Sequence, residues 1–112
     1  DKDIVIVEGV FDAIKAGNAI PLLGSTLRPS SKLFEAIVKS GRKVYLALDD
    51  DAADKERRMA NLFSSYNVEV YKVDTTGFED VGEMTKVEFL QRKEKAAPIE
   101  KENYLLERLA AI

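Results

Sequence analysis

The sequence predicts an α/β fold with a four-stranded, mostly parallel sheet flanked by helices. Short apolar runs rich in β-branched residues recur along the chain, and segments with helical spacing of apolar residues separate them. Parallel neighbours need a crossover that is normally helical, so this alternation favours a parallel sheet between helices. The 112 residues fit one compact domain.

The first strand is expected over residues 4–7, because a β-branched run without a polar interruption indicates a strand buried on both faces. A short helix is expected over 10–17, where apolar residues recur at helical spacing until a glycine and an asparagine end the pattern. A second strand is expected over 19–23, closed by the Gly-Ser-Thr segment 24–26.

The next helix is expected to begin at Pro29 and to end at Gly41, since proline suits a first helical turn and glycine a helix end. The third strand is expected over 43–48, followed by a helix over 52–66 and a fourth strand over 68–73. Each strand is therefore followed by a segment long enough for a crossover.

The C-terminal part is less regular. Asp80 and Glu83 resemble a capping box before a helix over 84–90, and the charged and small residues 91–98 indicate a linker. We therefore expect one domain over 1–92, and a linker and C-terminal helix over 93–112 that docks on the core or on another domain.

Composition excludes several chemistries. The chain has no cysteine and no histidine, which excludes zinc fingers, disulfides and imidazole bases. A net charge of −3 has the wrong sign for gripping a long duplex. There is no apolar run of the ~18 residues that a membrane span needs and no export signal at the first residues, so a cytoplasmic fragment of a longer protein is expected.

Acidic residues follow three of the expected strands. Glu8 follows the first strand, Asp49 and Asp51 the third, and Asp80 the fourth. In an open parallel sheet the ligand crevice lies beyond the carboxyl ends of the strands. An extended chain through 49–51 would point the side chains of Asp49 and Asp51 the same way, so we expect these carboxylates to meet at one edge.

Crowded carboxylates favour a bound cation, because two unit charges ~4 Å apart repel by about 4 kcal/mol at an effective dielectric of ~20. Oxygen ligands alone favour Mg²⁺ first and Mn²⁺ second, with a phosphate-bearing substrate. An alternative stays open: Asp51 and Asp80 each precede an expected helix, where an aspartate can simply be the N-cap.

Segments 8–12 (EGVFD), 48–53 (LDDDAA) and 79–80 (ED) together resemble the motifs of the Toprim family, over about residues 3–90. Among Toprim proteins the chain is most similar to phage and bacterial DNA primases, which share the Gly-Ser/Thr turn here found at 24–26. Two departures are Asp54, where primases commonly have glycine, and the Val-Gly pair at 81–82.

The resemblance implies a Rossmann-like Toprim fold and Mg²⁺-dependent nucleotidyl transfer, with Mn²⁺ as an alternative ion. RNA primers would be made from nucleoside triphosphates on a single-stranded DNA template, with a replicative helicase as a further partner and other domains needed for activity. The location would be the cytoplasm, that of the host for a viral protein. The catalytic residues would be Glu8, Asp49 and Asp51, with Glu8 as acid/base; the same three would bind metal, helped by Asp80 and Asp12.

Phosphate or nucleic-acid contacts are expected from six side chains near these acids: Ser25, Thr26, Arg28, Lys55, Arg57 and Arg58. For the basic ones, a solvated helix face or turn is the alternative interpretation. Two other functions stay open. One is a Toprim nuclease or topoisomerase domain, and the other is a regulatory or interaction module whose acids no longer bind metal, which metal titration would distinguish.

Overall fold

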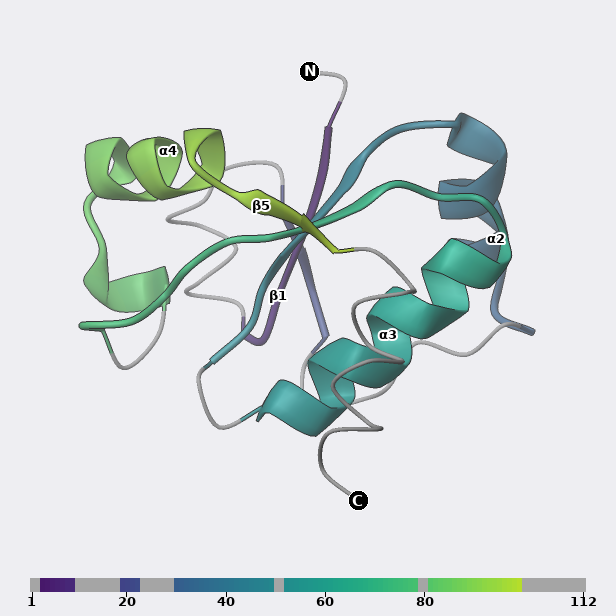
Figure 1. The fold of residues 1–112 in the computed structure, drawn as a ribbon, viewed down its shortest axis with the longest axis horizontal. Coiled ribbons are helices and arrows are strands. Elements are labelled where there is room, and N and C mark those ends of the chain that lie inside the picture. Colours follow the sequence, from purple (N-terminus) through teal and green to yellow (C-terminus); the bar gives the residue numbers. More distant parts are fainter. Residues whose placement is uncertain (1–2, 10–18, 23–29, 50–51, 79–80, 100–112) are drawn as a thin grey trace.

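The computed structural model describes residues 3–9, 19–22, 30–49, 52–78 and 81–99. The helix expected over 10–17 lies outside them. Within the described residues the chain forms these elements in order: β1 (Ile4–Val7), β2 (Ala19–Pro21), α2 (Lys32–Ser40), β3 (Val44–Ala47), α3 (Ala53–Ser65), β4 (Val70–Lys72), the 3-10 helix η2 (Val81–Glu83), α4 (Lys86–Glu94) and β5 (Ala97–Ile99) (Figure 1).

The strands form one five-stranded sheet in the order β2-β1-β3-β4-β5. β1 pairs in parallel with β2 and β3, and β3 pairs in parallel with β4. Among the strands that the structure describes, only β5 runs antiparallel, beside β4. The predicted α/β class and the mostly parallel sheet are confirmed, while the predicted number of strands was one too few.

Two hydrophobic cores cover the two faces of the sheet. Along β1, Ile6 belongs to the core under α2 and α3, whereas Val5 and Val7 belong to the core that includes Phe89 of α4. This is the alternation that a strand buried on both faces requires. Figure 1 shows α2 and α3 on one side of the sheet and α4 on the other.

Helix α2 begins later than predicted. Its N-cap is Ser31, whose hydroxyl accepts a hydrogen bond from the Phe34 N–H at 3.1 Å, so the residue preferred at an N-cap sets the start rather than Pro29, which lies outside the described residues. The helix ends at Gly41, as predicted. Gly41 adopts a left-handed conformation with φ 67°, and its N–H donates to the carbonyl of Val38.

Substituting Gly41 with alanine is expected to reduce the free energy of unfolding by about 1 kcal/mol, because a Cβ disfavours the left-handed conformation. No heavy atom of the described residues lies within 4 Å of a Cβ placed there, so the loss is conformational rather than steric. Urea denaturation of Gly41→Ala and Gly41→Asn measures it. Asparagine tolerates this conformation and should lose less; equal losses in the two variants would contradict the argument.

The predicted linker over 91–98 is wrong. Helix α4 continues to Glu94, and Ala97–Ile99 forms β5 against β4. The three residues of β5, one of them a proline, show no strand pattern in the sequence. They form a strand because they pair with the neighbouring β4. The division of the chain near residue 92 stays a prediction, and that residue lies inside α4.

The capping box of α4 is formed by Thr85 and Glu88, and the box expected at Asp80 and Glu83 stays a prediction. The Thr85 hydroxyl accepts from the Glu88 N–H at 3.1 Å, and the Glu88 carboxylate accepts from the Thr85 N–H at 2.8 Å. The hydrogen bond that the Glu88 carboxylate accepts from the Thr85 N–H, followed by its interaction with the Thr85 side chain, lowers the pKa of Glu88. Glu83 belongs to η2, and Asp80 lies outside the described residues. No helix in the described part of the chain is long and apolar enough to span a membrane.

Candidate functional site

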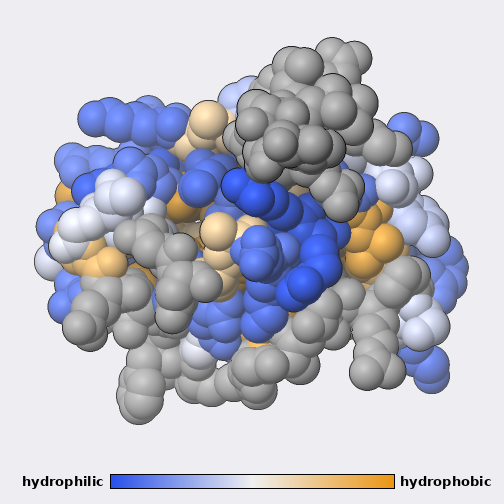
Figure 2. Space-filling view, turned by 60° about the horizontal axis from the view of Figure 1, so that its bottom comes forward, coloured by the Kyte–Doolittle hydropathy of each residue, from blue (hydrophilic) through white to orange (hydrophobic). Residues whose placement is uncertain are grey.

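The carboxyl ends of β1 and β3 bring two acidic residues to one edge of the sheet. β1 and β3 are parallel and paired from Ile4 with Val44 to Val7 with Ala47. Glu8 follows β1 directly, and Asp49 lies two residues beyond β3. Paired strands run ~4.8 Å apart, so both residues leave the sheet at neighbouring positions. Figure 2, which brings this end of the molecule forward, shows hydrophilic residues gathered over its centre.

Glu8 is held in a mostly buried position. Its side chain is 19% exposed, and Oε2 lies 3.5 Å from Nζ of Lys55. The other oxygen, Oε1, is buried and accepts no hydrogen bond from the described residues. A buried carboxylate oxygen without a donor is costly and calls for a positive partner, so Glu8 is suited to receive a cation.

Asp49 is half-buried, with Oδ1 inaccessible to solvent. Its backbone carbonyl accepts the Ala52 N–H at 2.9 Å, which turns the chain from β3 into α3. The N-cap position of α3 is occupied by Ala52 without a side-chain hydrogen bond. The capping role that was the alternative for Asp51 stays a prediction, because Asp51 lies outside the described residues.

Thr75 is a site residue that the sequence did not indicate. It is 4% exposed, and its hydroxyl donates to the carbonyl of Leu48 at 3.2 Å. This bond joins the segment after β4 to the residue just before Asp49. In the sequence, Thr75 looks like an ordinary loop residue after a strand. Its contact with Leu48 becomes evident only once β3 is known to pair with β4. Thr75 fixes the end of β3 from which Asp49 projects.

The basic residues of α3 divide into two groups. Lys55 turns toward Glu8 and is 18% exposed, whereas Arg57 and Arg58 are exposed. The predicted phosphate contacts of these three residues stay predictions. The remaining predicted site residues lie outside the described residues: Asp12, Ser25, Thr26, Arg28, Asp51 and Asp80. In the part of the chain that is described, no three acidic side chains gather into a metal-binding group.

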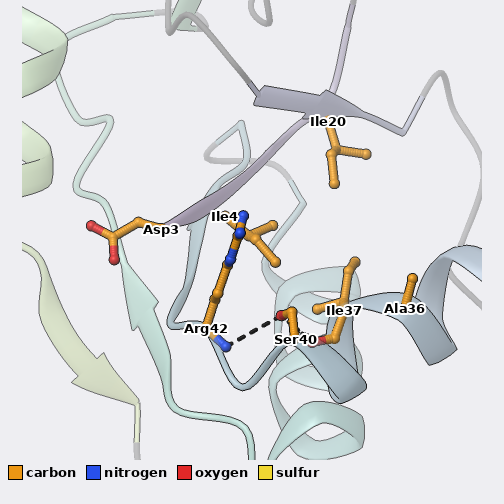
Figure 3. A pocket seen from close by; sticks show the side chains of 7 residues that line it. All are labelled: Asp3, Ile4, Ile20, Ala36, Ile37, Ser40 and Arg42. Carbon is orange, nitrogen blue, oxygen red and sulfur yellow. Dashed lines mark hydrogen bonds between the residues drawn. The ribbon is translucent and has the colours of Figure 1, made fainter. Parts of the chain in front are cut away.

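A pocket of about 580 Å³ lies toward the opposite end of the sheet from these acids. Asp3 and Ile4 at the start of β1 line it, together with Ser40 at the end of α2 and Arg42 just before β3. Figure 3 shows the Arg42 backbone N–H donating to the Ser40 hydroxyl, at 3.2 Å. Among the site residues that the structure describes, neither Glu8 nor Asp49 lines this pocket.

No family model matches the chain, and no curated protein matches it. Its structure is similar to that of the primase of Aquifex aeolicus, a crystal structure of the zinc-binding and RNA polymerase domains, with a TM-score of 0.69 and 24% sequence identity. The match covers 88% of this chain and 27% of that one. At this identity the likeness shows that the two share a fold. The chain corresponds to a minor part of the primase's length.

Proposed function

We propose that the chain is the catalytic Toprim domain of a DNA primase, which joins ribonucleotides on a single-stranded DNA template in a Mg²⁺-dependent reaction. The observation that carries the proposal is the placement of Glu8 and Asp49 at the ends of adjacent parallel strands, with Glu8 Oε1 buried and without a donor among the described residues. The fold shared with a primase supports it.

The described residues fit a hard divalent ion. Glu8 and Asp49 offer carboxylate oxygens, and the chain has no cysteine or histidine to favour a softer metal. We propose Asp51, Asp80 and Asp12 as the further ligands, with Mn²⁺ as a substitute for Mg²⁺. When bound, such an ion neutralises triphosphate charge and orients an in-line attack.

The residues themselves have distinct proposed roles. Glu8 accepts the proton of the attacking 3′-hydroxyl, directly or through water. Asp49 and Asp51 hold the ion, and Arg57 and Arg58 bind phosphates of the triphosphate or template, with Ser25, Thr26 and Arg28 contributing from the turn after β2. The substrates are nucleoside triphosphates and template DNA, a replicative helicase is a partner, and the reaction takes place in the cytoplasm.

Addition of Mn²⁺ is expected to raise the melting temperature of the chain, and Asp49→Asn is expected to abolish most of that rise. An ion that binds only the folded state at 100 times its Kd stabilises by about 2.7 kcal/mol, which is several degrees for a domain of this size. Differential scanning calorimetry with and without the ion measures the effect, and Mg²⁺ should act in the same direction.

The matched control is Glu94→Gln, which removes an exposed carboxylate from α4 and should leave the Mn²⁺ response intact. If the melting of the unsubstituted chain were the same with and without metal, the enzymatic proposal would fail and a non-enzymatic interaction module would be favoured.

A further inference from the structure

The pairing of Lys55 with Glu8 joins two elements that are 47 residues apart in the sequence. Both side chains are less than one-fifth exposed, at 18% and 19%. The ion pair of Lys39 with Glu35 on α2 contrasts with it, since those side chains are 74% and 59% exposed. Exposed pairs are screened by water and contribute little. The Lys55 pair is shielded from water and places a positive charge beside Glu8.

Lys55 supplies positive charge at the same carboxylate that would bind a divalent ion. Two cations at one carboxylate repel each other, and the repulsion grows as water is excluded. A lysine that stayed in place would weaken metal binding. The lysine stem is long and flexible and its ammonium can rotate onto another acceptor, so it needs a second anionic partner to leave Glu8.

We propose that Lys55 exchanges partners, from Glu8 in the substrate-free protein to a substrate phosphate when the metal-binding carboxylates are engaged. This rests on the proposed function. A substrate phosphate is the second partner that allows Lys55 to leave Glu8, so phosphate binding favours metal binding. Metal binding favours phosphate binding by the same factor, because one coupling free energy links the two ligands. Glu8 thus stays neutralised in the absence of substrate.

The test is a pair of titrations on the Lys55→Met variant. With Mn²⁺ alone, followed by electron paramagnetic resonance of the free ion, the variant is expected to bind about tenfold more tightly than the unsubstituted chain, because the competing cation is gone. With Mg²⁺-ATP at excess Mg²⁺, followed by calorimetry, it is expected to bind about tenfold more weakly, because a phosphate contact is gone.

Two further variants complete the design. Lys55→Arg keeps the positive charge and changes only the geometry of the cationic group. Its affinities for Mn²⁺ and for Mg²⁺-ATP should therefore stay within about threefold of those of the unsubstituted chain. Lys39→Met removes the exposed pair on α2 and should change neither titration. Tighter Mn²⁺ binding together with weaker Mg²⁺-ATP binding in Lys55→Met would not result from the loss of a lysine with a purely structural role.

The outcomes separate this inference from the proposed function. If Glu8→Gln weakens Mn²⁺ binding but Lys55→Met leaves it unchanged, or weakens both titrations, the exchange of partners is wrong and the metal site stands. If the unsubstituted chain binds no Mn²⁺, the proposed function fails and the inference fails with it.

Discussion

Glu8→Gln is expected to reduce primer synthesis at least 100-fold, measured as ribonucleotide incorporation by the protein that carries this domain. The physical reason is that glutamine keeps the size and polarity of the side chain but cannot accept a proton. General base catalysis typically contributes about 10²- to 10⁴-fold. Oε1 of Glu8 is buried without a donor among the described residues, so glutamine brings no loss of an existing hydrogen bond there.

The control for this variant is the unfolding transition, which should stay close to that of the unsubstituted protein. Glutamine gives up the ion pair with Lys55 but relieves the burial of a charge, and these effects oppose each other. Glu94→Gln, an exposed substitution on α4, should retain full activity. A loss of less than about tenfold in Glu8→Gln would exclude Glu8 as the base, given the usual size of that effect.

The sequence predicts the central strands well, because their signal is strong and local. β1 and β3 are runs of apolar residues buried on both faces of the sheet. Such short runs are typical of central parallel strands. β5 has no such signal, with two exposed residues and one half-buried. It becomes a strand because β4 presents an unpaired edge, and this is a tertiary effect that a local pattern does not contain.

The two capping boxes illustrate a different limit. Asp80 with Glu83 and Thr85 with Glu88 both have the spacing of the motif. Of the two, the structure describes the box of Thr85 and Glu88, which follows Val81 and Met84, both buried in the core that includes Phe89. Burying these residues places η2 against the sheet, and α4 begins at Lys86 with Thr85 as its N-cap.

For the site, the sequence predicts which residues follow the strands but not what they contact. Glu8 and Asp49 are placed at one edge by parallel pairing, as predicted. The contact of Lys55 with Glu8 depends on the rotation of α3 about its own axis, which is set by the burial of Met59 and Phe63. Thr75 is placed by β4. Neither contact follows from spacing along the chain.

The second large effect is expected in the core. Phe63→Ala should reduce the free energy of unfolding by about 3 to 5 kcal/mol, as is typical for a buried phenylalanine. Phe63 is fully buried, and its ring stacks on that of Phe34 at 5.1 Å between centroids. Single domains are stable by only about 5 to 15 kcal/mol, so this variant should be close to unfolding at 37 °C.

Urea denaturation measures this loss, and two variants calibrate it. Phe63→Leu keeps much of the apolar volume and should lose clearly less, because the cost follows the cavity that remains. Val87→Ala on α4 changes a side chain that is 63% exposed and should lie within about 0.5 kcal/mol of the unsubstituted chain. If Phe63→Ala cost less than 1 kcal/mol, α3 would not be held by this core.

Both outer strands of the sheet contain a proline, Pro21 in β2 and Pro98 in β5. Proline has no backbone N–H, so a further strand that approached either side would meet a gap in the row of donors. Unprotected sheet margins recruit other chains and lead to aggregation. In the sheet that the structure describes, these two prolines therefore oppose backbone pairing with a neighbouring molecule at β2 and β5.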